Sequence, residues 1–343
     1  MKESKSMRKK AILWKKAGGG DVHCFLCAHN CKISEDGFGF CGMRQNVGGE
    51  LYTYAYGRVI ANHVDPIEKK PLYHFLPGTY AYSVATIGCN FKCTFCQNWT
   101  ISQMTARDEE VSGLELKPEE IVKEAITHKC RSISYTYTEP TVFFEYALDT
   151  AKIAKKKGLR NNFVTNGYMT AEAIETIAPY LDAANVDLKF FNDETYKKMC
   201  CGSLQPVLDS IQNMKKAGIW VEVTTLVVPG QNDSEKELRA IASFIAETNK
   251  DIPWHISRFH PDYKYTESSP TPIETMEEAL EIGKEEGLRY IYLGNINTRA
   301  ETICPECGKS LIDRAGFTAK ISEDFTSNGR CRSCGTVIPG VWE

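Results

Sequence analysis

Short runs of β-branched and aromatic residues alternate with amphipathic helical patterns from Tyr80 to Asn295, and this alternation limits the fold more than any other feature. Because strands that alternate with helices pair in parallel through right-handed crossovers, we predict an α/β fold whose six or seven strands form an open or partial barrel. Parallel sheets carry their chemistry where the strands end. The expected strands are 79–87, 132–137, 161–167, 183–190, 220–228, 254–259 and 289–296. The expected helices are 113–130, 141–158, 170–181, 208–218, 234–249 and 273–287.

The composition is that of a soluble globular protein and argues against several kinds of partner. The chain has 343 residues, of which 42% are hydrophobic and 25% charged, and its net charge is -3. Such a balance favours neither nucleic acid nor an anionic membrane as a partner. No run of about 18 apolar residues predicts a membrane span. The basic N-terminus lacks the apolar core of a signal peptide, and residues 1–20 are expected to be a solvated basic tail.

Cysteines are unusually many and are grouped. Eleven of the fourteen fall into three tight groups, with C-x2-C pairs in each. Without a secretion signal such pairs indicate metal ligands rather than disulfides, and a reducing, cytoplasmic compartment follows. We divide the chain into the basic tail (1–20), an N-terminal cysteine-rich segment with a linker (21–78), the barrel (79–298) and a C-terminal zinc-ribbon-like domain (299–343).

The middle group has three cysteines instead of four, directly after the first expected strand. Cys89, Cys93 and Cys96 have C-x3-C-x2-C spacing, which lets one loop place three sulfurs around a single cubane. Three thiolates hold three irons of a [4Fe-4S] cluster and leave the fourth iron open to a small molecule, as a catalytic zinc keeps an open position. A zinc site or unpaired core cysteines are the alternatives.

This loop resembles the signature of the radical S-adenosylmethionine (SAM) superfamily, C-x3-C-x-aromatic-C, here Cys89, Cys93, Phe95 and Cys96. The resemblance implies that the open iron binds the amino and carboxylate groups of SAM. It also implies reductive cleavage of SAM to methionine and a 5′-deoxyadenosyl radical, which takes a hydrogen atom from the substrate. Phe95 would lie near the adenine. The resemblance also implies that the α/β fold is the partial, TIM-like (β/α)6 barrel of radical SAM enzymes.

The resemblance also assigns SAM contacts to the ends of the second and third strands. In "TYTEP", Glu139 would bind the SAM amino group, with an ordinary carboxylate at a helix N-terminus as the alternative. In "VTNG", Thr165 and Asn166 resemble the family's contacts to the SAM carboxylate and ribose. Glycyl-radical activating enzymes commonly have an acidic residue before this Thr-Asn pair, where the present chain has Val164.

Two later strand ends carry further candidates. Asp187 and Lys189 in "VDLK" resemble the DLK of glycyl-radical activating enzymes, with a rim lysine as the alternative for Lys189. His260 in "RFHP" resembles a histidine near the SAM adenosine, with a structural histidine as the alternative.

The two outer groups each offer four thiolates. The C-terminal one pairs two C-x2-C-G knuckles across a 23-residue spacer, which is typical of a structural zinc ribbon with no open position; its cysteines are Cys304, Cys307, Cys331 and Cys334. The N-terminal one has C-x2-C-x3-C-x9-C spacing; its cysteines are Cys24, Cys27, Cys31 and Cys41. Four thiolates suit zinc or an auxiliary iron–sulfur cluster, and we favour zinc.

Motifs from Cys24 to Trp342 narrow the resemblance. "CFLCAHNCKI", "YGRVIANHVDPIEKKPLYHFLPG", "GCNFKCTFCQNW" and "IPGVW" resemble the radical SAM protein of the AmmeMemoRadiSam system. That resemblance implies Memo-like and AMMECR1-like protein partners, besides SAM and an electron donor such as flavodoxin or ferredoxin. The expected function is that of an oxidoreductase-type radical SAM enzyme acting on an unidentified substrate.

Two alternatives belong to other classes. A glycyl-radical activase, similar to the pyruvate formate-lyase activating enzyme, would generate a stable radical on a large partner protein. A non-catalytic iron–sulfur or zinc scaffold would bind no SAM and yield no 5′-deoxyadenosine.

Overall fold

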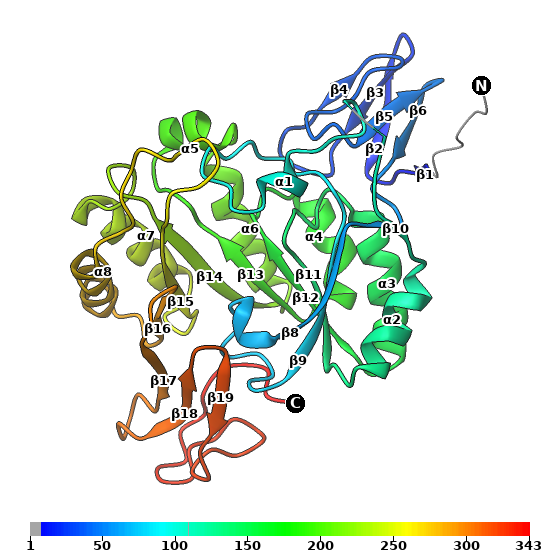
Figure 1. Cartoon of the computed structure of the whole chain (residues 1–343). Coiled ribbons are helices and arrows are strands. Elements are labelled where there is room, and N and C mark those ends of the chain that lie inside the picture. Colours follow the sequence, from blue (N-terminus) through cyan, green and yellow to red (C-terminus); the bar gives the residue numbers. More distant parts are fainter. Residues whose placement is uncertain (1–7, 109) are drawn as a thin grey trace.

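The computed structural model describes residues 8–108 and 110–343, built around one mixed sheet (Figure 1). Its strands run in the order β16-β15-β14-β13-β12-β11-β9-β8, and all pairs are parallel except β8 with β9. The spatial order from β9 to β16 follows the chain order, and right-handed crossovers that all advance in one direction place the connecting helices on one face of the sheet. The strands are β8 (Ala61–Pro66), β9 (Tyr80–Ala85), β11 (Ser132–Tyr135), β12 (Arg160–Thr165), β13 (Ala183–Asp187), β14 (Trp220–Val227), β15 (Trp254–Arg258) and β16 (Ile291–Gly294).

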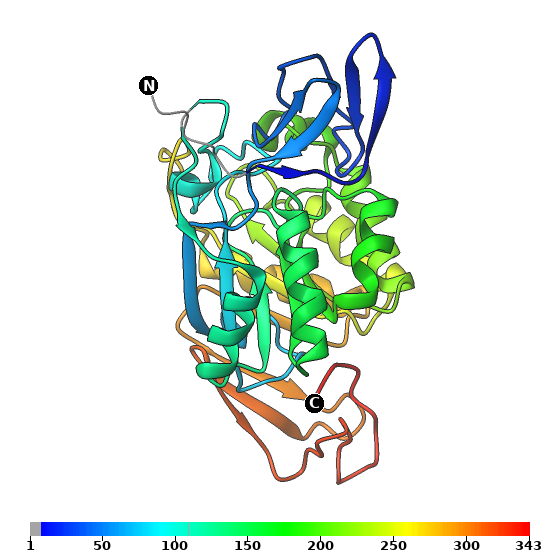
Figure 2. The same ribbon diagram turned by 90° about the vertical axis from the view of Figure 1, so that its right-hand side faces the viewer.

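Helices fill the connections between these strands and cover one side of the sheet (Figures 1 and 2). Their ends follow local chemistry: Thr170 and Ser234 accept hydrogen bonds from the first turns of α4 and α7, which satisfies N–H groups that have no partner within the helix. The α-helices are α1 (Trp99–Ser102), α2 (Pro118–Thr127), α3 (Phe144–Lys156), α4 (Ala171–Ile177), α5 (Asp193–Cys200), α6 (Gln205–Lys216), α7 (Glu235–Thr248) and α8 (Ile273–Glu285). Two 3-10 helices are η1 (Ile67–Lys69) and η2 (Ala178–Tyr180).

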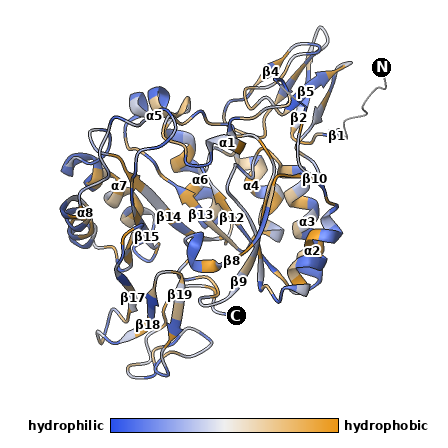
Figure 3. Cartoon of the chain, viewed as in Figure 1, coloured by the Kyte–Doolittle hydropathy of each residue, from blue (hydrophilic) through white to orange (hydrophobic). Residues whose placement is uncertain are grey.

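Each strand and helix expected between Tyr80 and Asn295 overlaps an observed element, although several helices are shorter than expected. The helix expected over 113–130 begins only at Pro118, because Leu114–Glu115 pairs as β10 with β7 (Arg58–Val59). Helix α5 lies in the stretch between the fourth expected strand and the next helix, where no helix was expected. The central strands are largely apolar and the outer helix faces polar (Figure 3), which places the core between the sheet and the helices.

Residues 9–53 form two small sheets above one end of the central sheet (Figures 1 and 2). One sheet contains β1 (Lys9–Lys10), β6 (Glu50–Thr53) and β5 (Arg44–Val47), and the other β2 (Trp14–Gly18), β3 (Asp21–Cys24) and β4 (Lys32–Ile33). Strands β1 and β2 lie within the stretch expected as a basic tail, where pairing with β6 and β3 orders residues 9–18. Residues 1–7 of that expected tail lie outside the described part of the chain.

The C-terminal residues form a third small sheet at the opposite end (Figures 1 and 2), from β17 (Arg299–Ile303), β18 (Ser310–Ala315) and β19 (Thr318–Ile321). Arg314 anchors it, since its buried guanidinium donates to the Tyr73 carbonyl at 2.6 Å. The Val341 N–H also donates to the His74 carbonyl at 2.8 Å. Among the helices of residues 8–108 and 110–343, none is both long and apolar enough to cross a lipid bilayer.

Candidate functional site

One large cavity, of about 850 Å³, opens at the carboxyl edge of the central sheet. It is lined by the residues that follow β9, β11, β12 and β13 and by inward side chains of β14, β15 and β16. Its volume falls in the range of pockets that hold cofactors and small molecules, roughly 300–1,000 Å³. The position at the strand ends is where a parallel sheet is expected to bind its ligand.

The loop after β9 brings Cys89, Cys93 and Cys96 to the wall of this cavity. N–H donors face the first sulfur: the Phe91 N–H lies 3.3 Å from the Cys89 sulfur, and the Asn166 amide 3.7 Å from it. The Ser102 hydroxyl lies 3.2 Å from the Cys96 sulfur. Three sulfurs on one loop, with hydrogen-bond donors beside two of them, fit a cluster held through three thiolates.

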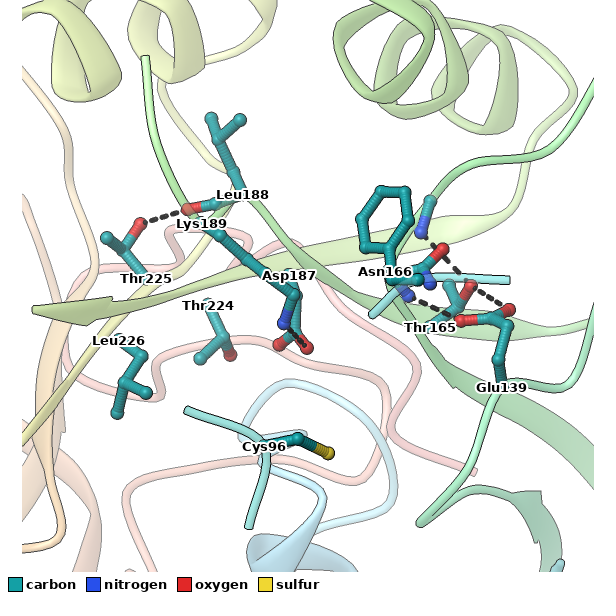
Figure 4. A network of polar contacts seen from close by, with 12 residues as sticks. Cys96, Glu139, Thr165, Asn166, Asp187, Leu188, Lys189, Thr224, Thr225 and Leu226 are labelled. Atoms are coloured by element: carbon teal, nitrogen blue, oxygen red, sulfur yellow. Dashed lines mark hydrogen bonds and ion pairs between the residues drawn. The ribbon is translucent and has the colours of Figure 1, made fainter. Parts of the chain in front are cut away.

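Glu139 lies at the centre of a polar network across the ends of β11 and β12 (Figure 4). One carboxylate oxygen, Oε1, accepts from the Thr141 N–H (3.0 Å), the Thr141 hydroxyl (2.6 Å) and the Thr165 hydroxyl (2.7 Å). The other, Oε2, accepts from the Asn166 N–H at 2.8 Å. Burial raises the pKa of Glu139 above its ordinary value, although these hydrogen bonds oppose the shift. Since Oε2 has a single partner, it keeps a free acceptor position toward the cavity that Glu139 lines.

Asp187 and Lys189 form an ion pair at the end of β13, with 2.7 Å between the ammonium and the carboxylate. Both residues line the cavity, and Figure 4 shows the pair across from Glu139, Thr165 and Asn166. Burial lowers the pKa of Lys189, but Asp187 and Cys93 outweigh it and leave the pKa well above its ordinary value. The lysine therefore presents a fixed positive charge beside the three-cysteine loop.

Phe95 and His260 differ in their placement. Phe95 is buried, lines the cavity and packs edge-on against Phe190, with 5.8 Å between the ring centroids. His260 is exposed and is not among the described residues that line the cavity. Its imidazole contacts the side chain of Gln97, a lining residue, at 3.1 Å. Among the residues expected to contact SAM, His260 is therefore the one that does not line the cavity, and it contacts a lining residue instead.

Several lining residues were not expected from the sequence. His255 and Ser257 both face the cavity from β15, and the His255 imidazole is held by the buried Glu222 at 2.6 Å. Since side chains alternate along a strand, the sequence does place both residues on one face of β15. It does not show which face of the sheet lines the cavity. Phe317 also lines the cavity, from the C-terminal domain. Because most of the other lining residues lie far away in the sequence, no local pattern predicts this position.

The two outer cysteine groups differ in spacing. In the C-terminal group all four sulfurs lie within 4.8 Å of one another, which fits a single tetrahedral ion with metal–sulfur bonds of about 2.3 Å. That set is Cys304, Cys307, Cys331 and Cys334. No other group of three or more His, Cys, Asp or Glu ligand atoms in residues 8–108 and 110–343 is that compact. The N-terminal set instead lines a small separate cavity; it consists of Cys24, Cys27, Cys31 and Cys41.

The N-terminal cysteine-rich segment contacts the three-cysteine loop directly. The His29 imidazole lies 2.7 Å from the Asn90 carbonyl, next to Cys89. The Ala28 N–H donates to the Tyr168 carbonyl at 3.2 Å, beyond the end of β12. None of the fourteen cysteines pairs with another in a disulfide.

Comparison with known proteins identifies the central region. The family model described as "Radical SAM superfamily" matches residues 83–242, which include the three-cysteine loop and the ends of β11, β12 and β13. An uncharacterised protein of Methanocaldococcus jannaschii is 46% identical over 333 residues, covering 96% of this chain and 98% of that protein.

More distant relatives are named for their activities. The pyruvate formate-lyase-activating enzyme of Clostridium pasteurianum is 25% identical over 179 residues, covering 49% of this chain and 72% of that enzyme. A crystal structure of a domain of the pyruvate-formate lyase-activating enzyme from Bacteroides vulgatus covers 48% of this chain and 99% of that domain. Its identity to this chain is 16% and its TM-score 0.42.

Proposed function

Residues 83–242 form a domain of the radical SAM superfamily, and from this premise we propose that the protein is an enzyme that cleaves SAM reductively to take a hydrogen atom from a substrate. The observation that carries the proposal is the shared cavity, where the three-cysteine loop faces Glu139, Thr165 and Asn166. The family implies a [4Fe-4S] cluster and SAM. We further propose that the open sheet around the cavity is a partial (β/α)6 barrel.

Cys89, Cys93 and Cys96 would hold the cluster through their sulfurs. When bound, the cluster supplies one open iron for SAM and the electron that splits it into methionine and a 5′-deoxyadenosyl radical. The donors from Phe91, Asn166 and Ser102 would stabilise thiolates, because N–H and O–H groups favour the charged form of a sulfur acceptor.

The polar groups of the cavity divide into an anionic and a cationic side. The free acceptor position of Glu139 would bind the SAM ammonium. The same carboxylate accepts from the Thr165 hydroxyl and the Asn166 N–H, and these two residues would contact the SAM carboxylate and ribose. Phe95 would pack against the adenine. Lys189, held by Asp187, would contact an anionic part of SAM or of the substrate.

The substrate would occupy the rest of the cavity, toward His255 and the Phe317 hairpin of the C-terminal domain. We assign structural zinc to the four C-terminal cysteines, whose compact spacing supports it. The reduced cysteines support a cytoplasmic location with flavodoxin or ferredoxin as electron donor. The proposed Memo-like and AMMECR1-like partners rest on the sequence motifs alone.

The test is anaerobic reconstitution with iron and sulfide, followed by reduction with dithionite in the presence of SAM. We expect 5′-deoxyadenosine by mass spectrometry from the wild type and none from the variant with Cys89, Cys93 and Cys96 replaced by Ala. Candidate Memo-like and AMMECR1-like proteins are then added, and new products are sought. No 5′-deoxyadenosine from the wild type with a complete cluster would contradict the proposal.

A glycyl-radical activase is the second candidate, favoured by the activating enzymes among the relatives and by the Asp187–Lys189 pair. It requires a large partner with a radical-bearing glycine. Val164, which lines the cavity where such activases commonly carry an acid, weighs against it. A stable doublet signal on a candidate partner after reaction would favour this candidate over the first.

A further inference from the structure

The four N-terminal cysteines surround a small cavity between the N-terminal strands and the core. Cys24, Cys27, Cys31 and Cys41 contribute from one side, and Asn90, next to Cys89, contributes from the core. The cavity is separate from the large one, whose wall contains none of these residues. An assignment of its content therefore adds a third metal centre, besides the three-cysteine loop and the C-terminal cysteines.

The spacing of the sulfurs argues against a single ion. Around one zinc, sulfurs at about 2.3 Å from the metal lie within roughly 4 Å of one another, and the C-terminal group comes close to that arrangement. The N-terminal sulfurs do not form such a compact set in the described part of the chain, and neither do those of Cys89, Cys93 and Cys96. Sulfurs that bind separate irons at the corners of a cube stand farther apart than sulfurs on one ion.

Two buried donors without partners point to the same cavity. Arg44 and Asn90 both line it, with exposed fractions of 2% and 1%. The Arg44 Nε–H and the Asn90 amide NH2 have no hydrogen-bond partner, while another Arg44 nitrogen, Nη1, already donates to the Cys24 sulfur at 3.4 Å. Buried donors are rarely left unpaired, so an acceptor is expected here. A zinc ion brings no acceptor of its own, whereas an iron–sulfur cluster adds inorganic sulfides that accept N–H hydrogen bonds.

We infer that Cys24, Cys27, Cys31 and Cys41 bind a second [4Fe-4S] cluster, with Arg44 and Asn90 as donors to its sulfides. All four irons then have a protein ligand, so this cluster has no open position for SAM. Asn90 links the two cluster sites. It lines the N-terminal cavity, and its Oδ1 accepts a hydrogen bond at 2.8 Å from the Asn166 amide, which lies beside Cys89. This assignment replaces the zinc that the spacing of the cysteines along the sequence favoured.

The experiment uses the full-length variant with Cys89, Cys93 and Cys96 replaced by Ala, reconstituted anaerobically with ferrous iron and sulfide. We expect about four iron, about four sulfide and about one zinc per chain, the zinc belonging to the C-terminal group. After reduction, its electron paramagnetic signal should be the same with and without SAM. About two zinc and no iron, a single iron without sulfide, or no metal at the N-terminal group would overturn the inference.

A matched variant separates this result from misfolding. Cys27→Ser with Cys41→Ser, in the otherwise intact chain, should lose about four iron and keep both the C-terminal zinc and a SAM-sensitive signal. Since the SAM-sensitive signal reports the other centre, a failed inference here leaves the proposed function untouched. Loss of both signals together, with zinc retained, would also contradict two independent centres.

Discussion

Glu139→Gln tests the assignment of the SAM ammonium site, because it removes the charge and keeps the volume of the side chain. The amide retains one carbonyl oxygen in place of two. The Thr141 and Thr165 hydroxyls can rotate to accept from the new NH2 group. The backbone N–H groups of Thr141 and Asn166 cannot, since they point to different oxygens of the carboxylate. One of them is therefore left without an acceptor.

Two magnitudes follow. A buried N–H without an acceptor costs about 1–3 kcal/mol of folding stability. A hydrogen bond between the SAM ammonium and a carboxylate is worth roughly 1.5–3 kcal/mol. Since about 1.4 kcal/mol is a factor of ten, we expect the dissociation constant of SAM to rise about 10- to 100-fold. Urea unfolding measures the first effect, and calorimetry on the reconstituted, oxygen-free protein measures the second.

Glu222→Gln is the matched control. Glu222 is also fully buried and also accepts four hydrogen bonds, from the Tyr73 and His74 N–H groups, the Trp220 indole and the His255 imidazole. It does not line the cavity among the described residues. The control should lose comparable stability with unchanged SAM affinity. Equal SAM affinity in Glu139→Gln and the wild type, or equal weakening in both variants, would refute the reasoning.

Three further predictions concern stability and metal content. Burial raises the pKa of Glu222, but the hydrogen bond from His255 and neighbouring positive charge outweigh it and hold the pKa below its usual 4.5. The contribution of the ionised Glu222 to folding stability is therefore present above about pH 4.5 and is lost as the pH falls through the pKa of the folded state. The difference in unfolding free energy between the wild type and Glu222→Gln should therefore shrink in acid, and a constant difference would contradict it. Arg44→Met leaves Glu145 buried without its ion-pair partner and should lower the free energy of unfolding in urea by about 3–5 kcal/mol. Adding Glu145→Gln should restore much of this loss, and no restoration would contradict the pairing. Cys304→Ser should remove about one zinc per chain and lower the thermal midpoint, and unchanged zinc content by metal analysis would contradict the assignment.

The central fold follows from local patterns in the sequence. The alternation of strands and helices sets the order of β9 to β16, and the parallel arrangement then brings Cys89, Glu139, Thr165 and Asp187 to one edge. Such a convergence needs only the direction of the strands, which right-handed crossovers fix.

What the sequence did not reveal depends on long-range contacts. Strand β8 joins the sheet antiparallel at its edge, although half of its residues are polar and its apolar residues do not alternate. Residues 9–10 pair with the distant strand β6, whereas residues 14–18 pair with the neighbouring strand β3 in a local hairpin. Phe317 reaches the cavity because Arg314 and His74 fix the C-terminal domain to the linker, and His260 turns outward toward Gln97.

The most direct test of the central claim is the electron paramagnetic spectrum of the reduced, reconstituted protein before and after SAM is added. The account predicts a [4Fe-4S] signal of which one component shifts with SAM and disappears in the variant lacking Cys89, Cys93 and Cys96. A spectrum that SAM leaves unchanged in the fully loaded wild type would contradict an open iron at this loop, and with it the proposed chemistry.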